Sequence, residues 1–380
     1  MFKTSARANQ ATLEAPSTIT DTNITRTAHF QFLDALRGLA SAWVVLFHLT
    51  VSSTLPAVTG GVHGFLWGTI FGRGGLGVAV FFVLSGFVIC HSLRRGLGSG
   101  PELGTYLLRR AIRLTPPYWA AIGVAVAVHG LAAAVNHESF APGGAPLSVG
   151  RVLSHLFYLE GLVGHEYIND VFWTLTVEMQ FYIVLGVFLM GVTVLGRGRR
   201  RTFTVPVWGA AALTLAGVRF DGDPQTTFVP LFYAFFLGAI VYWAWTARIG
   251  YGIVAVYLGV LGLLFVERPD AFLATTILTG GLMLAAAATN DGLARWLSAP
   301  PFQFLGRISY SLYLTHVPVQ GAVLLVVVNV AGTGPTAVVL AAVLSTVASL
   351  VAALVFWRAI ERPAMRWSSS LKKPNPVDAR

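Results

Sequence analysis

The side chains best suited to chemistry in this sequence are a few ionisable groups inside long apolar segments. His48 follows Arg37 by eleven positions in the first of these segments. At about 100° per residue, this interval places both side chains on one helix face, within about 20° of each other and roughly 16 Å apart along the axis. The pattern predicts a guanidinium at one rim of a membrane and a buried imidazole, a potential general base, on the same stripe. Each residue alone also has a structural interpretation, with Arg37 as a snorkelling anchor and His48 as a bond between helices.

A carboxylate is expected at the same depth as this imidazole. Glu178 lies about seven residues into a segment that runs in the opposite direction, which corresponds to roughly 11 Å. A carboxylate beside an imidazole fixes its tautomer and stabilises its charged form. We therefore expect Glu178 to orient His48, and the alternative is a structural ion pair or hydrogen bond within the bundle.

Hydroxyl groups form two further clusters within apolar segments. Ser309, Tyr313 and His316 are spaced by four and three residues and so share one helix face. Such a stripe must face protein or water instead of lipid. Ser85, inside the run Phe81–Phe87, adds a hydroxyl beside a glycine. Both clusters are also explained by helix packing and structural hydrogen bonding.

A group of arginines stands near the rim that holds Arg37. Arg110 and Arg113 close a basic segment that ends at Pro116 and Pro117. Guanidinium groups suit phosphate because their fork geometry allows bidentate hydrogen bonds. Membrane topology alone also explains such arginines. The Gly-rich run at 72–77 follows no predicted strand, so it is interpreted as a flexible start to a helix and not as a nucleotide loop.

The elements that must position these residues are transmembrane helices. Of the 380 residues, 55% are hydrophobic and only 11% are charged, against about 25% charged in soluble domains. The mean hydropathy is +0.69, and apolar runs near 20 residues recur to the end of the chain. The single cysteine, Cys90, excludes an intrachain disulfide. We predict an all-α, polytopic bundle of about ten spans at 33–53, 75–93, 116–135, 171–195, 203–219, 228–246, 249–267, 271–289, 306–330 and 336–360.

The distribution of charge predicts the orientation of this bundle. The net charge is +10, yet one set of alternate loops holds only Arg73, Arg151, Arg219 and Arg268. By the positive-inside rule these loops face outward, and both termini are cytoplasmic. The basic balance thus indicates topology, not nucleic-acid binding. We expect a flexible cytoplasmic tail at 1–30, the membrane domain at 31–365 and a second cytoplasmic tail at 366–380.

The loops carry two further expectations. The segment at about 94–115 is predicted to be an amphipathic helix on the inner side, and Pro116 and Pro117 to begin the next span. The longest outer loop, at about 136–170, has an apolar stretch at 152–162 that suits a re-entrant or interfacial helix.

An ordered series of motifs resembles the acyltransferase-3 family of membrane O-acyltransferases. Each motif is weakly specific, but their order and the ten-span pattern make the resemblance strong. It covers residues 32 to 363 and rests on Arg37 with His48, the run Phe81–Phe87, Arg110 with Arg113, Trp173 with Glu178 and Phe181–Tyr182, Ser309–Tyr313 with His316, and Glu361–Pro363.

The resemblance implies an activity and a donor. Members of this family acylate, and usually acetylate, hydroxyls of cell-surface polysaccharides, lipopolysaccharide, peptidoglycan, macrolides or oligosaccharides similar to Nod factors. It implies acyl-coenzyme A, usually acetyl-coenzyme A, as co-substrate, no metal, and a glycan or glycosylated small molecule as acceptor. It also implies a location in the inner membrane of a bacterial cell, in contact with the lipid bilayer. The sequence leaves open whether the chain forms a homodimer.

The resemblance also distributes roles among the residues. It implies catalysis by His48, which we pair with Glu178, and donor binding by Arg37, Arg110 and Arg113, to which we add Asp34. The substrate-binding or structural network comprises Ser85, Trp173, Ser309, Tyr310, Tyr313, His316 and Glu361.

Two mechanisms and a second class of function remain open from the sequence. His48 acts either as a general base on the acceptor hydroxyl or as a nucleophile that carries the acyl group. Ser309, Tyr310, Tyr313 or His316 is suited to stabilise the oxyanion or to orient the acceptor. The alternative function is a transporter or flippase subunit for a polysaccharide precursor, in which His48, Glu178 and His316 relay protons. Inverted repeats and broken helices would favour that function, and the sequence shows neither.

Overall fold

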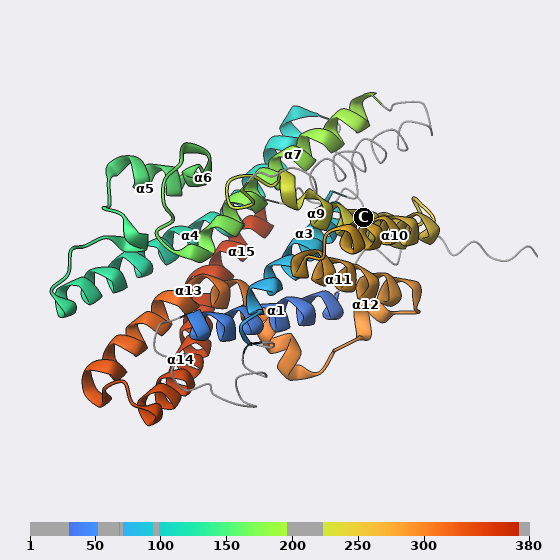
Figure 1. Cartoon of the computed structure of the whole chain (residues 1–380). Coiled ribbons are helices and arrows are strands. Elements are labelled where there is room, and N and C mark those ends of the chain that lie inside the picture. The colour runs from blue at the N-terminus through green and yellow to red at the C-terminus, as the bar shows by residue number, and fades with distance from the viewer. Residues whose placement is uncertain (1–29, 52–67, 69–70, 94–98, 196–222, 372–380) are drawn as a thin grey trace, which may run out of the picture.

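The computed structural model describes residues 30–51, 68, 71–93, 99–195 and 223–371, and every regular element among them is helical (Figure 1). The long helices are α1 (Gln31–Val51), α3 (Gly77–Ser92), α4 (Gly100–Asn136), α7 (Trp173–Leu195), α9 (Phe232–Trp245), α10 (Tyr251–Glu267), α11 (Ala271–Ala288), α13 (Pro300–Ala331) and α14 (Pro335–Phe356). Shorter elements are η3 (Gly74–Leu76), α5 (Val149–Leu156), α6 (Glu160–Val163), α12 (Gly292–Arg295), η8 (Trp357–Glu361) and α15 (Arg362–Ser370).

The predicted all-α membrane bundle is confirmed. Among the residues that the structure describes, seven helical segments are long and apolar enough to cross a membrane, and α9 and α10 are shorter apolar helices. Every predicted span except 203–219 contains one of the long helices, and 203–219 lies outside the described residues. The count of ten spans and the orientation of the termini stay predictions, and the N-terminal tail at 1–30 falls almost wholly outside the described residues. At the other end, α15 carries helical structure to Ser370, into the segment expected as a tail.

The predicted break at Pro116 and Pro117 is wrong, because α4 runs through both prolines as one helix of 37 residues. At about 1.5 Å per residue, such a helix is roughly 55 Å long and exceeds the hydrocarbon core of about 30 Å. The amphipathic segment and the span that follows are therefore two parts of one helix. The two prolines remove the backbone donors to the carbonyls of Ile112 and Arg113, a loss that membrane helices tolerate where neighbouring groups surround the helix.

Close contacts between backbones fix the helices that carry the candidate site. α1 packs along α13, α13 along α14, and α3 along α9, and Figure 1 shows α13 and α14 as an antiparallel pair beside α1. At the α1–α13 crossing, a Cβ on Gly38 would lie 2.5 Å from the nitrogen of Gly306, and one on Gly306 would overlap the carbonyl oxygen of Asp34. Gly86 and Gly238 make the same kind of reciprocal contact between α3 and α9. Small residues permit this approach, and van der Waals packing then holds membrane helices together.

We call the end of the bundle that carries α5, α6 and the α13–α14 turn the outer end, after the orientation predicted from charge. There α5 and α6 form the short helices of the 136–170 loop, and Val149 and Phe157 on them are exposed. The guanidinium of Arg151 holds the loop together by donating to the carbonyls of Pro142 (2.6 Å), Ala145 (2.5 Å) and Glu166 (2.8 Å). Arg151 is thus a structural residue.

A buried carboxyl joins this loop to the spans. Glu160 has no exposed surface, and its Oε1 accepts hydrogen bonds from the hydroxyls of Tyr118 (3.0 Å) and Thr176 (2.7 Å). Burial raises the pKa of Glu160 above its ordinary value of 4.5, although both hydrogen bonds act in the opposite direction. A raised pKa in the folded state means that stability is present at low pH and is lost as the pH rises through the folded value.

This site gives a prediction about stability. Glu160→Gln should keep both hydrogen bonds and make the thermal midpoint in detergent less dependent on pH above about 4.5, because the amide does not ionise. Glu160→Leu should cost about 1–3 kcal/mol, because it leaves the Tyr118 and Thr176 hydroxyls without an acceptor. Melting curves at a series of pH values measure both effects. An identical pH dependence in the wild-type and Gln proteins would contradict the assignment.

Candidate active site

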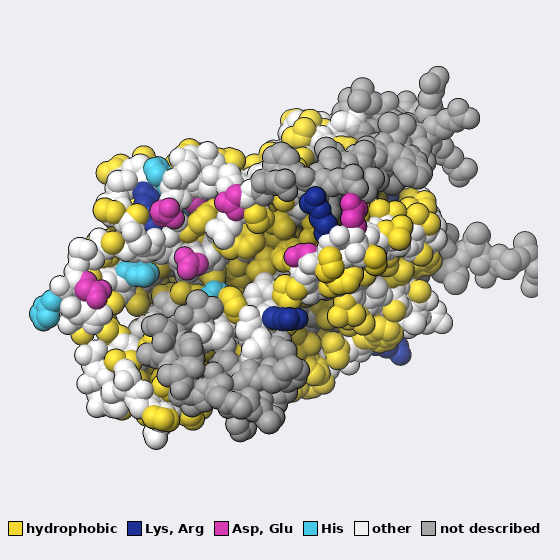
Figure 2. Space-filling view, in the orientation of Figure 1, with side chains coloured by type: hydrophobic (Ala, Val, Ile, Leu, Met, Phe, Trp, Pro, Cys, Tyr) yellow, Lys and Arg dark blue, Asp and Glu magenta, His cyan; other side chains and the backbone are white. Residues whose placement is uncertain are grey.

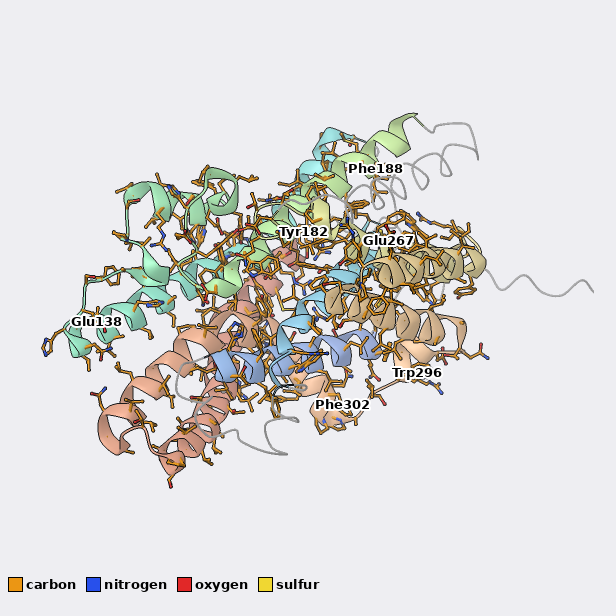
Figure 3. All side chains as sticks on the ribbon, viewed as in Figure 1. Glu138, Tyr182, Phe188, Glu267, Trp296 and Phe302 are labelled. Carbon is orange, nitrogen blue, oxygen red and sulfur yellow. The ribbon has the colours of Figure 1, made fainter. Side chains whose placement is uncertain are left out.

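Most of the predicted site residues line one internal cavity of about 100 Å³ between α1, α3, α4, α7, α13 and η8. Figure 3 places Tyr182, which also lines this cavity, among the packed side chains in the middle of the bundle, whereas Glu138 lies at its outer end. We call this space the inner cavity. The predicted residues that line it are Arg37, Ser85, Arg110, Arg113, Glu178, Ser309, Tyr310, Tyr313 and Glu361. His48, His316, Asp34 and Trp173 do not.

Three guanidinium groups give the inner cavity its positive charge. Arg37 forms an ion pair with Asp34 one turn earlier in α1. Arg110 donates from Nη2 to the Ser92 hydroxyl (3.2 Å) and lies 5.0 Å from the centre of the Tyr182 ring. Arg113 is half-buried and has no hydrogen-bond or ion-pair partner among the described residues. The side chain of Arg113 is therefore available to an anionic or carbonyl group that enters the cavity.

Both carboxylates of the cavity are engaged by hydroxyl groups. Glu178 accepts hydrogen bonds from Ser85 (2.5 Å) and from Tyr182. Glu361 accepts from the backbone nitrogen (3.1 Å) and the hydroxyl (2.5 Å) of Ser311. Glu361 closes η8, a π-helical segment, and such segments occur frequently at functional sites. The hydrogen bonds hold both carboxylates to the cavity wall.

The tyrosines and serine of α13 also have partners. The hydroxyl of Tyr310 donates to the carbonyl of Leu114 (2.9 Å), and that of Tyr313 is shared with Thr174 (2.8 Å). Ser309 donates to the carbonyl of Gly306 in its own helix. In this arrangement the two tyrosine hydroxyls fix α13 against its neighbours, and an oxyanion role requires any of the three hydroxyls to change partner.

The side chain in contact with His48 is His316, not Glu178. His316 Nε2 lies 3.2 Å from His48 Nδ1, and the two ring centres are 4.8 Å apart. His48 Nδ1 is also 2.9 Å from the carbonyl of Val44, and His316 Nδ1 is 3.0 Å from that of Leu312. Because a carbonyl only accepts, each Nδ1 carries a proton, and His316 Nε2 is the acceptor that faces His48.

This assignment leaves His48 Nε2 unprotonated and without a hydrogen-bond partner among the described residues. It is the nitrogen available to take a proton from a substrate. The hypothesis that Glu178 orients His48 has no direct contact to support it, because Ser85 and Tyr182 occupy the Glu178 carboxylate. The contact that the sequence analysis expected from Glu178 is made by His316 instead.

The histidine pair lines neither the inner cavity nor a second space, which we call the outer hollow and which is lined by Phe47, Arg73, Trp173 and Arg268 among others, but residues of both spaces pack against the two rings. On one side, the ring of Tyr313, which lines the inner cavity, is 5.9 Å from that of His316. On the other side, the ring of Phe47 is 5.1 Å from that of His48 and lines the outer hollow. Trp173 lines the same hollow, and its ring is 6.2 Å from that of Phe82, which lines the inner cavity. Aromatic rings thus separate the two spaces beside the histidines.

One contributor to the site was not predicted. Tyr182 bonds to Glu178 and packs against Arg110, so it connects the acidic and basic walls of the cavity. The signal was present in the sequence, because Tyr182 follows Glu178 by four residues and therefore lies on the same helix face.

Comparison with known proteins gives one matching family and several relatives. A family described as an acyltransferase domain matches residues 30–358. The exopolysaccharide production protein ExoZ of Rhizobium meliloti is 32% identical over 319 residues, which cover 78% of this chain and 91% of ExoZ. BcsY of Komagataeibacter xylinus, provisionally named a membrane-bound transacylase, is 28% identical over 75% of this chain and 72% of its own length. Nodulation protein 10 of Rhizobium leguminosarum is 26% identical over 78% of this chain and 83% of its own. No solved structure matches the chain.

Proposed function

Because the chain belongs to the acyltransferase-3 family of membrane O-acyltransferases, we propose that it transfers an acyl group, most simply acetyl, from cytoplasmic acyl-coenzyme A to a glycan hydroxyl at the outer end. The observation that carries this proposal is the single cavity that collects three arginines and ends beside a histidine pair. Membership of the family decides for an enzyme over the transporter considered from the sequence. That two relatives are named for exopolysaccharide production and transacylation supports a polysaccharide acceptor.

The donor enters from the side of Arg37, Arg110 and Arg113. Coenzyme A carries several phosphates, and guanidinium groups bind phosphate by charge-assisted, bidentate hydrogen bonds. The inner cavity, at about 100 Å³, is smaller than the roughly 300–1,000 Å³ of pockets that enclose whole ligands. It therefore admits the narrow thioester arm, while the nucleotide remains outside at the cationic rim. Arg113, which forms no hydrogen bond or ion pair with the described residues, is placed to contact the arm or its phosphates.

His48 acts on the acceptor hydroxyl in the transfer step. Its Nε2 takes the hydroxyl proton while the hydroxyl oxygen attacks the thioester carbonyl carbon, which places negative charge on the carbonyl oxygen. When this intermediate collapses, the C–S bond breaks. The leaving thiolate then takes the proton from the imidazolium of His48. The products are the O-acyl ester and free coenzyme A. His316 keeps the His48 proton on Nδ1 through its unprotonated Nε2, and Glu178 keeps its hydrogen bonds with Ser85 and Tyr182 without entering the step.

The experiment that tests this function follows label from donor to acceptor. Purified protein in lipid nanodiscs is incubated with acetyl-coenzyme A labelled in the acetyl group and with surface polysaccharide from the source cell. We expect alkali-labile label on the polysaccharide and one free thiol per ester formed. Thiol release without labelled polysaccharide, or no reaction with either compound, would overturn the proposal.

Arg113 gives a sharper test of the donor site. Arg113→Gln should raise the KM for acetyl-coenzyme A about 10- to 100-fold, because one charge-assisted hydrogen bond contributes about 1.5–3 kcal/mol. The matched control is Arg109→Gln, which removes a cation from the same helix but outside the cavity, where Arg109 bonds to the carbonyl of Ser368. Steady-state kinetics with varied donor separate KM from kcat. An equal rise in KM for both variants would show that general charge near the membrane, not the cavity, attracts the donor.

A further inference from the structure

The outer hollow is large enough to hold a substrate. It encloses about 700 Å³, within the roughly 300–1,000 Å³ typical of ligand pockets. It lies where α1 ends, α3 and α7 begin, and α10 passes into α11. Figure 2 shows a hollow with an apolar floor in this face of the molecule and charged side chains at its rim. The side chains that matter for the inference are Phe47, Trp173, Tyr233, Arg73, Arg268 and Asp270.

The two arginines at the rim are unusual for the outer end. The sequence assigns four arginines to outer loops, and Arg151 is occupied by backbone carbonyls. Arg219 lies outside the described residues. Arg73 and Arg268 come from different loops, yet both line this one hollow. Both side chains are exposed and have no hydrogen-bond or ion-pair partner among the described residues.

Among the described residues that line the hollow, Asp270 is the one carboxylate, and it forms no ion pair with either arginine. Asp270 Oδ2 accepts a hydrogen bond from the backbone nitrogen of Leu273 (2.6 Å) and caps the N-terminus of α11. The rim therefore presents two unpaired guanidinium groups. Their planar forks match the geometry of carboxylate and phosphate groups. Charge complementarity favours an anionic ligand.

The floor of the hollow suits a sugar ring. Trp173 and Phe47 are partly exposed, and Tyr233 lies beside them. Aromatic side chains offer a large, rigid and apolar surface with a polar edge in Tyr and Trp, and the C–H faces of a pyranose are apolar. The arginines at the rim thus complement the charged group of an acidic saccharide, and the aromatic rings of the floor complement its apolar ring face.

The hollow lies next to the reacting group without including it. Phe47 lines it and precedes His48, whose ring centre is 5.1 Å from that of Phe47. On the opposite side of the aromatic layer, Thr174, the next residue after Trp173, lines the inner cavity. A saccharide in the hollow would therefore approach His48 from the side opposite the donor.

We propose that the outer hollow is the acceptor site and that its acceptor is an anionic saccharide, held through its carboxylate or phosphate by Arg73 and Arg268 over the Trp173 and Phe47 rings. This inference rests on the proposed acyltransfer, and it adds the charge of the acceptor and the residues that select it.

The test compares two saccharides that differ only in charge. A glucuronic-acid-containing oligosaccharide and its carboxyl-reduced counterpart are offered to wild-type protein and to the Arg73→Gln/Arg268→Gln variant. We expect the variant to raise the KM for the acidic form about 10- to 100-fold and to leave the KM for the reduced form and for acetyl-coenzyme A unchanged. Arg295→Gln is the control, an exposed arginine away from the hollow that pairs with Asp291. Equal KM values for both saccharides in all three proteins would overturn the inference.

A second arm identifies the anion and excludes lipid. A saccharide without uronic acid that is linked to polyprenyl diphosphate replaces the acidic probe, and loss of its affinity in the double variant assigns the arginines to phosphate. Measurements are made in nanodiscs of zwitterionic lipid and repeated in nanodiscs that also contain anionic phospholipid. If the defect of the double variant occurs only with anionic phospholipid present, the arginines bind lipid headgroups and the inference fails.

Binding without turnover separates this inference from the proposed function. Titration of the acidic oligosaccharide into the His48→Ala protein should show binding that the double arginine substitution weakens. If acyl transfer occurs but the arginines do not affect acceptor binding, the acceptor site is wrong and the acyltransfer stands. If the arginines bind the saccharide but label never reaches it, the proposed function is wrong.

Discussion

His48→Ala should lower kcat for acyl transfer about 10²- to 10⁴-fold, the range that a positioned general acid–base contributes, and leave the KM for acetyl-coenzyme A near its wild-type value. The expectation follows from the Nε2 of His48, which has no hydrogen-bond partner among the described residues, on a ring that packs against Phe47 of the outer hollow. Initial rates of coenzyme A release with saturating acceptor measure the effect. A variant that keeps more than a tenth of the wild-type kcat would exclude His48 as the base.

The same substitution distinguishes the two mechanisms. If His48 is acylated, wild-type protein quenched in acid without acceptor should carry one acetyl mass on the peptide that contains His48, and His48→Ala should not. Direct transfer predicts no such adduct in either protein.

His316→Gln should lower kcat less than His48→Ala does, because the amide oxygen can still accept a hydrogen bond at the place of Nε2. Its defect should lie in the pH profile of kcat more than in donor binding. An effect of His316→Gln equal to that of His48→Ala would assign the reacting role to the pair.

Gly306→Val should prevent the protein from folding stably. A Cβ at residue 306 overlaps the carbonyl oxygen of Asp34, so the α1–α13 crossing must open. Overpacking ordinarily costs about 1–3 kcal/mol where side chains can adjust, and here the obstacle is backbone, so a larger loss is expected. Loss of the monodisperse peak in detergent, together with a lower thermal midpoint, measures it.

A control for Gly306→Val stands on the same helix. A Cβ on Gly321 of α13 meets nothing within 4 Å, so Gly321→Val should fold and retain activity. Gly38→Val, on the facing helix, should destabilise the protein as Gly306→Val does. The loss of stability in the variant that carries both substitutions should not exceed the sum of the two single losses, because both act on one contact. If Gly306→Val behaves as Gly321→Val does, the tight crossing is not required for folding.

The sequence predicts depth along a helix well and neighbours across helices poorly. Periodicity placed Arg37 and His48 at two levels of α1, and composition located the helices themselves. The contact between His48 and His316 joins residues 268 positions apart and depends on the glycine crossing that brings α1 onto α13. Neither hydropathy nor spacing encodes which helices meet.

Glu178 also shows that depth along a helix does not predict contacts between helices. Its depth matched that of His48, and from depth alone it was paired with the imidazole. In the structure α3 packs against both α1 and α7 and supplies Ser85, which donates a hydrogen bond to the Glu178 carboxylate from a neighbouring helix. The direction in which a side chain points around its helix axis decides its partner, and that direction becomes useful only when the neighbouring helix is known.

The prolines of α4 and the outer hollow could not be foreseen for a related reason. Pro116 and Pro117 ordinarily mark a helix start, but in α4 the helix continues on both sides of them. The hollow is formed by loops between different helices, whose residues carry no common motif. Arg73 and Arg268 were recognised only as exceptions to the charge rule.

The packed rings of Phe82 and Trp173 affect how much activated acyl group is lost to water. On the proposed mechanism, a thioester in the inner cavity lies behind the packed rings of Phe82 and Trp173, so that water from the outer hollow has to pass these rings to reach it. Wasteful hydrolysis of the activated acyl group is therefore suppressed until an acceptor hydroxyl displaces or passes the rings. The thioester made in the cytoplasm is thereby used for acylation at the outer end only when an acceptor sugar is present.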